Sequence, residues 1–151
     1  MGDNAFLWAF VLNLGVVFGA GLYEQRISVP RWVGREAWRR EEAVRDDTGR
    51  RFWGFTATVP LTLLTLANLW VGAHASGPLQ RWWLLAAGLA LAERVFTFAY
   101  FIPRMVWLMR TDDSPQARAG AARWAALNRP RLGLTLLAWL AAMQAFALAH
   151  P

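Results

Sequence analysis

A glutamate and an arginine stand next to each other in the middle of a long apolar run. Glu93 and Arg94 lie well inside residues 82–102. Ionisable groups at that depth in hydrocarbon are costly unless they are paired or line a cavity. Helical spacing from Glu93 places three more polar residues on the same face, namely Thr97, Tyr100 and Arg104. This face must therefore point toward the inside of a helical bundle.

The other apolar runs carry polar residues that match this face. Glu24 closes the first run, while Asn128 and Arg131 precede the last one. One hypothesis is a polar pocket, open to the cytoplasm or the inner leaflet, formed by Glu24, Glu93, Arg94, Tyr100, Asn128 and Arg131. The alternative is that the same groups only pair with one another and hold the helices together. The sequence leaves both open.

Four apolar runs are candidates to position these side chains in a membrane. They cover residues 5–23, 55–73, 82–102 and 132–149, and each approaches the roughly 20 residues that a helix needs to cross the hydrocarbon. Helices are required because lipid cannot satisfy free backbone groups. With 56% hydrophobic residues, we predict an all-α integral membrane four-helix bundle that forms one domain, 1–151.

The arginines are distributed unevenly between the runs, and this predicts the orientation of the chain. The two long loops hold Arg26, Arg31, Arg35, Arg39, Arg40, Arg45, Arg50, Arg51, Arg104, Arg110, Arg118, Arg123, Arg129 and Arg131. The connection between the second and third runs has only Arg81. The positive-inside rule then places both long loops in the cytoplasm and both termini outside, in a bacterial-type inner membrane. Helix-start signals at Pro30 and Pro115 predict short cytoplasmic interfacial helices in these loops.

The positive charge also bears on the partners. A net charge of +6 is compatible with nucleic-acid binding, but the arginines flank apolar runs, so we assign them to topology and to anionic membrane lipids. We predict no nucleic-acid partner. The chain has no cysteine, and His74 and His150 lie at the ends of predicted helices. We therefore predict no metal site.

Small and aromatic residues give further expectations about packing. Gly15 and Gly19 form a small-residue face that lets another helix approach, either within the bundle or from another protein or a second copy. Six tryptophans near the ends of the runs are expected to anchor the protein at the membrane interfaces. They are Trp8, Trp53, Trp70, Trp82, Trp83 and Trp107.

Several short motifs follow one another in a fixed relation to the four runs. They are Tyr23-Glu24 with Pro30, Phe52-Trp53 with Pro60, Tyr100-Phe101-Ile102-Pro103, and Trp124-x-x-Leu127-Asn128-x-x-Arg131. In these motifs, and over nearly its whole length, the chain resembles the anthrone oxygenase-like family of small four-span membrane proteins. Many bacterial members of that family have no assigned function. At Met105 the chain departs from relatives that often carry asparagine there.

The resemblance implies a chemistry. The characterised activity in the family oxygenates a phenolic anthrone to an anthraquinone without a metal or flavin, so it implies no cofactor. Such a reaction needs a base for an acidic C–H group and donors for the resulting phenolate. By resemblance, Glu24 or Glu93 is the base. The substrate-binding residues are Tyr100, Asn128, Arg131, Arg94 and Trp53.

Three classes of function are consistent with these features. The first is a membrane enzyme acting on a lipophilic aromatic molecule. The second is a non-catalytic accessory or assembly subunit of a larger membrane complex. A small transporter ranks last, because the sequence shows no broken-helix repeats.

Overall fold

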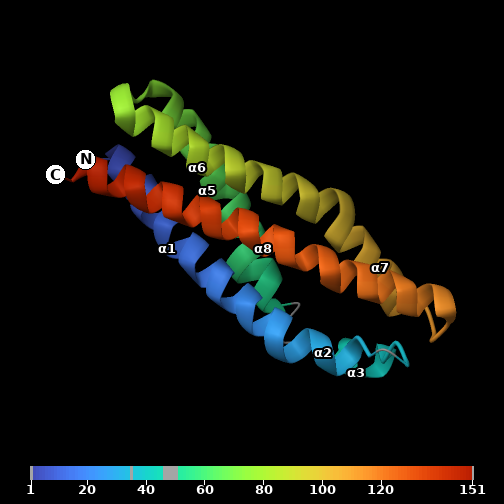
Figure 1. Cartoon of the computed structure of the whole chain (residues 1–151). Helices are drawn as coiled ribbons and strands as arrows, with labels where there is room; N and C mark the ends of the chain where they lie inside the picture. Colours follow the sequence, from blue (N-terminus) through green and yellow to red (C-terminus); the bar gives the residue numbers. More distant parts are fainter. Residues whose placement is uncertain (1, 35, 46–50, 151) are drawn as a thin grey trace.

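The computed structural model describes residues 2–34, 36–45 and 51–150, and most of them are helical (Figure 1). The helices are α1 (Gly2–Tyr23), α2 (Val29–Trp32), α3 (Arg40–Arg45), α5 (Val59–His74), α6 (Gly77–Phe96), α7 (Ile102–Arg110) and α8 (Pro115–Ala149). Three π-helical segments adjoin these helices, namely η1 (Glu24–Ser28), η2 (Trp53–Thr58) and η3 (Thr97–Phe101). The described residues contain no β-strand. Arg35 and Arg50 lie outside the described residues.

The four predicted apolar runs lie within four helices that are long and apolar enough to cross a membrane. With their π-helical segments, these helices span Asn4–Trp32, Trp53–His74, Gly77–Arg110 and Pro115–Ala149. The prediction of an all-helical, four-helix architecture is therefore confirmed. Three of the helices extend well beyond the apolar runs. At 1.5 Å per residue α8 is about 52 Å long, compared with a hydrocarbon core of about 30 Å.

The chain ends and the two long connections lie at opposite ends of the molecule. Both termini and the α5–α6 turn lie at one end, which we call the termini end (Figure 1). The other end, which we call the arginine end, carries α2, α3, α7 and the first turns of α8. Around the bundle, α1 packs on α5 and α8, and α6 also packs on α5 and α8. The four long helices therefore enclose a common interior.

Small side chains let α6 and α8 approach each other closely. Ala86, Ala90, Ala138 and Ala142 are buried in the core, whereas large hydrophobic residues such as Leu63 are exposed on the outside. Exposing such an apolar surface to water is unfavourable, whereas exposing it to acyl chains is not. The packing therefore suits a hydrocarbon surround.

Trp83 is an exception to the interfacial position that the sequence predicts. Its side chain is buried, and its indole N–H donates to Asn68 Oδ1 at 2.8 Å. Asn68 Nδ2 in turn donates to the carbonyls of Leu64 and Phe6. Gly72 leaves room for the indole, since a Cβ there would lie 3.2 Å from the Trp83 ring. The prediction for Trp83 was wrong because its hydrogen-bond partner lies inside the bundle rather than in the headgroups. By contrast, Trp8, Trp70 and Trp82 are exposed.

The two glycines of the small-residue face have different surroundings. A Cβ at Gly15 would come within 3.1 Å of the Trp139 ring on α8. Gly19 is open, with nothing within 4 Å of a Cβ placed there. Helix packing within the chain therefore accounts for Gly15, while Gly19 lies on the outer surface.

At the arginine end, residues 29–34 and 36–45 fold over α7 and α8, and we call this segment the α2–α3 cover. The Trp38 indole donates to the carbonyl of Leu108 at 3.1 Å, and the Trp38 backbone N–H donates to Asp113 Oδ1 at 2.8 Å. Arg118 donates to both oxygens of Asp113. A second ion pair joins Arg40 to Asp112. Two neighbouring aspartates therefore fasten the cover to the α7–α8 connection.

We expect Asn68→Ala to destabilise the bundle by about 1 to 3 kcal/mol, because it leaves the buried Trp83 N–H without an acceptor. Unfolding of the purified protein in mixed micelles, followed by far-ultraviolet circular dichroism, measures the change. Leu66→Ala, on the exposed face of the same helix, is the control and should unfold close to the wild type. Equal losses in the two variants would contradict a structural role for Asn68.

The cover should be sensitive to acid. The hydrogen bonds from Arg118 and from the Trp38 backbone lower the pKa of Asp113 from its ordinary value of 3.8 to about 2. Folding therefore favours the ionised form, and its stabilisation is complete above 3.8 and is lost as the pH falls toward about 2. Melting temperatures over this range should fall more for the wild type than for Asp113→Asn. Parallel pH profiles of the two proteins would refute the link.

Candidate functional site

The glutamate and arginine inside the third apolar helix form a buried ion pair. Glu93 is 2% exposed and Arg94 is 4% exposed. Glu93 Oε2 lies 2.6 Å from Arg94 Nε and 2.5 Å from Arg94 Nη2. The other carboxylate oxygen, Oε1, accepts from Thr97 Oγ1 at 2.8 Å and lies 3.9 Å from Arg131 Nη1. One carboxylate thus compensates two guanidinium groups that approach it from α6 and α8.

A second polar pair lies beside this cluster. Trp53 Nε1 donates to Glu24 Oε1 at 2.8 Å, which ties η2 to η1. The Arg131 guanidinium lies 5.9 Å from the Trp53 ring centroid and 4.7 Å from the Phe101 ring centroid. These are cation–π distances. Arg131 therefore connects the two pairs through ring contacts and through the carboxylate of Glu93.

The local backbone explains how these side chains come to one level. Each of the three π-helical segments ends shortly before a proline, namely Pro30, Pro60 or Pro103. A proline lacks the N–H of the helical hydrogen bond and its ring crowds the carbonyl four residues earlier, so the preceding turn widens. The first residues of the three segments are Glu24, Trp53 and Thr97. All three line the same cavity.

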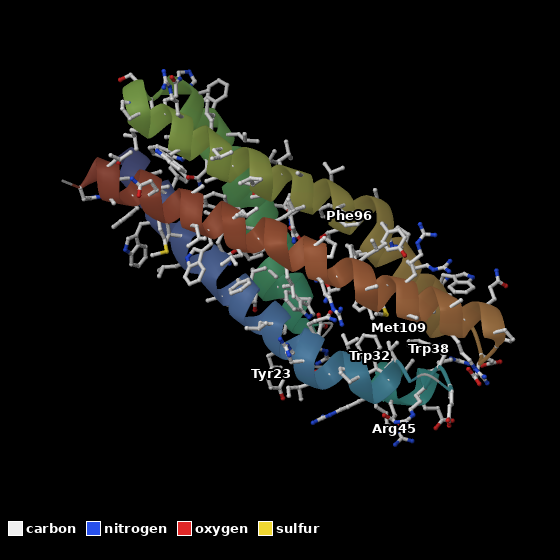
Figure 2. The ribbon with its side chains drawn as sticks, in the orientation of Figure 1. Tyr23, Trp32, Trp38, Arg45, Phe96 and Met109 are labelled. Atoms are coloured by element: carbon white, nitrogen blue, oxygen red, sulfur yellow. The ribbon has the colours of Figure 1, made fainter. Side chains whose placement is uncertain are left out.

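This cavity, of about 420 Å³, lies between the long helices and the α2–α3 cover. Its charged lining residues are Glu24, Arg94 and Arg131. Most of the remaining wall is apolar and is made by Trp32, Ala43, Val59, Phe101, Ile102, Met105, Val106, Met109 and Trp124. In Figure 2, Trp32, Trp38 and Met109 lie together between α2 and the α7–α8 pair. The volume falls within the usual range for small-molecule sites, about 300 to 1,000 Å³.

The structure brings most, but not all, of the predicted site residues together. Glu24, Trp53, Arg94 and Arg131 line the cavity, and Glu93 lies behind Arg94 and Thr97. Tyr100 and Asn128 are not among the lining residues.

Asn128 and Tyr100 have other surroundings. Asn128 Nδ2 donates to Gln25 Oε1 at 2.6 Å, and Gln25 Nε2 donates to the carbonyl of Ala125. These bonds tie η1 to α8. Tyr100 stacks on Phe96, and its buried hydroxyl has no hydrogen-bond partner in the described part of the chain.

Several wall residues were not among the candidates from sequence. Trp32 and Trp124 contact each other with ring centroids 5.6 Å apart, and the Trp124 indole donates to the carbonyl of Phe101. Met105 and Met109 complete this apolar side. Trp124 and Phe101 stand in the motifs that carry the family resemblance, so a signal for them was present. The contribution of Trp32 depends on how the cover folds, which periodicity does not reveal.

The arrangement joins an acid-base group and hydrogen-bond donors to an apolar chamber. Glu24 can accept a proton from a bound molecule, and Arg94 Nη1 is a buried donor that has no hydrogen-bond partner among the described residues. An anionic or carbonyl oxygen would satisfy it. Within the described ranges, no group of three or more histidine, aspartate or glutamate side chains is placed to hold a metal ion.

No protein-family model, curated protein or solved structure matches the chain. The resemblance to anthrone oxygenases therefore stays a prediction that depends on the motifs alone.

The two carboxylates should differ in their effect on stability. Glu93→Gln removes the carboxylate that is bonded to Arg94 and lies 3.9 Å from Arg131, and we expect a loss of about 3 to 5 kcal/mol. Glu24→Gln keeps an oxygen that can accept from Trp53, so the expected loss is below about 1.5 kcal/mol. Denaturant titration in mixed micelles compares them. A Glu93→Gln protein as stable as Glu24→Gln would show that Glu93 does not hold the arginines.

Proposed function

We propose that the chain is a multi-pass protein of a bacterial-type inner membrane, with its arginine end in the cytoplasm and both termini outside. The four long apolar helices support insertion. The orientation rests on the concentration of arginine at one end. In this orientation the α2–α3 cover, α7 and the first turns of α8 lie at the cytoplasmic interface. Exposed arginines such as Arg26 and Arg129 there contact anionic lipid headgroups.

We further propose that the protein binds a lipophilic aromatic molecule with a phenolic or carbonyl oxygen and oxygenates it without a cofactor. The observation that carries this proposal is the 420 Å³ cavity, in which Glu24, Arg94 and Arg131 share aromatic walls. An aromatic substrate would pack against the cavity wall that Trp32, Phe101 and Trp124 form. Its oxygen would accept from Arg94.

These positions support the following reaction. The Glu24 carboxylate takes a proton from the methylene carbon of an anthrone, and the resulting negative charge spreads onto the ring oxygen. The guanidinium groups of Arg94 and Arg131 stabilise that oxygen. The carbanion then reduces O₂ and forms a C–O bond. One atom of O₂ remains as the new carbonyl, and the other leaves as water with the two methylene hydrogens.

The geometry favours Glu24 over Glu93 as the base. Glu93 is committed to Arg94 and Thr97 and is buried behind them. Glu24 lines the cavity itself and is held by the Trp53 indole. Glu93 is then a positioning residue, because it sets the orientation of both arginines.

A non-catalytic accessory or assembly subunit is the second candidate. The observation that favours it is the open surface at Gly19, where a helix of another membrane protein or of a second copy could approach closely. Purification in mild detergent discriminates the two. A stoichiometric partner that is lost when Gly19 is replaced by leucine supports the subunit role.

Oxygenation is tested by oxygen uptake with purified protein and a dihydroxyanthrone, corrected for uptake without protein. We expect Glu24→Gln to lower the catalysed rate at least about a hundredfold, the usual range for loss of a general base. Melting temperature and elution volume check that the variant is folded. Leu66→Ala, on the outer face of α5, serves as the matched control and should retain the rate. A wild-type protein that does not exceed the spontaneous rate refutes the proposal.

A further inference from the structure

The cavity is closed on one side and open on another. At the arginine end it is covered by Trp32 of α2 and Ala43 of α3, and both side chains are buried. The ties from Trp38 and Arg40 to the α7–α8 connection hold this cover in place. On this side, a molecule from water would meet the buried side chains of the cover.

A second part of the wall is different, because three of its residues also belong to the outer surface. Val59 is 56% exposed, Ile102 is 39% exposed and Val106 is 43% exposed, yet all three line the cavity. Val59 begins α5, whereas Ile102 and Val106 belong to the first turns of α7. The wall between these helices is therefore a mouth of the cavity.

This mouth lies on the apolar surface of the bundle. Val59 and Ile102 belong to two of the four helices that can cross a membrane. Their exposed neighbours are also large hydrophobic residues, with Phe55 and Leu63 along the second apolar helix and Phe98 along the third. In a membrane, acyl chains rather than water cover such a surface.

At its polar end the cavity holds a group that can select a ligand. Arg94 is buried, lines the cavity and has no hydrogen-bond partner for Nη1 among the described residues. A hydrocarbon chain alone would leave this donor unsatisfied. A ligand whose oxygen accepts from the Arg94 guanidinium is therefore favoured over a hydrocarbon.

We propose that the cavity takes its ligand sideways from the lipid, through a portal formed by Val59, Ile102 and Val106. The ligand is a membrane-dissolved aromatic amphiphile with an acidic or carbonyl oxygen, which enters oxygen first and stops at Arg94. This inference deepens the proposed function, since it names the form in which the substrate is delivered.

The test uses a lipophilic phenol that carries a trifluoromethyldiazirine, dissolved in phosphatidylcholine–phosphatidylglycerol vesicles that contain the full-length protein. After illumination, mass spectrometry locates the labelled residues. We expect labelling at the buried walls Phe101 and Trp124. A bulky Val106→Trp should abolish it, whereas Leu63→Trp, on the lipid-facing surface outside the cavity, should leave it unchanged.

A second variant separates blocking from misfolding. Because the chain has no cysteine, Val106→Cys can be folded, reconstituted and only then modified with a benzyl thiosulfonate reagent. Loss of labelling after modification, reversed by a reducing agent, supports the portal. Labelling of Phe101 and Trp124 that persists after modification, or that is absent from the wild type, overturns it.

Photolabelling requires no turnover, so the portal and the oxygenase can fail separately. Portal-dependent labelling without oxygen uptake refutes the oxygenase and supports the portal. Oxygen uptake that is unaffected by closing Val106 supports the enzyme and overturns the portal. Labelling that increases in Asp113→Asn and does not change in Val106→Trp would mean that the ligand enters beneath the α2–α3 cover. This result would also overturn the portal.

Discussion

The charge balance around Glu93 is the constraint on which the arrangement of the helices depends. One carboxylate sits among two guanidinium groups and a threonine hydroxyl inside apolar helices, where separating any of these charges would be costly. Because Arg131 belongs to α8, this balance can be reached only when α6 and α8 lie in one register. The alanines of these helices then provide the close contact. Polar and apolar requirements are met by the same packing.

The sequence is sufficient to predict the four helices and the inward direction of Glu93 and Arg94, since apolar length and the cost of buried charge are local properties. Tyr100 shows where periodicity is insufficient. The sequence prediction places it by α-helical spacing, but Tyr100 lies within the π-helical segment η3, Thr97–Phe101. A π-helical turn holds more residues than an α-helical turn, so the inward face shifts and Phe101 takes the place in the cavity wall.

The tryptophans show a second kind of limit. The sequence does not distinguish a tryptophan at the membrane interface from one buried in the bundle. Both need a hydrogen-bond partner for the indole N–H. For Trp83 that partner is Asn68 on a neighbouring helix, and for Trp53 it is Glu24. Such pairs are separated in sequence and become visible only when the helices are placed. The α2–α3 cover likewise forms part of the cavity wall through contacts between residues that are distant in sequence.

The uninterrupted course of α8 has a mechanical consequence. The same helix carries Trp124 and Arg131 at the cavity and Ala138 and Ala142 in the bundle core. A displacement of the first half of α8 must either be transmitted along the helix or be absorbed where its hydrogen bonding is weakest. Pro130 provides that point, since it lacks one rung of the hydrogen-bond ladder. Pro130, next to Arg131, thus separates the part of α8 that lines the cavity from the alanines that pack in the core.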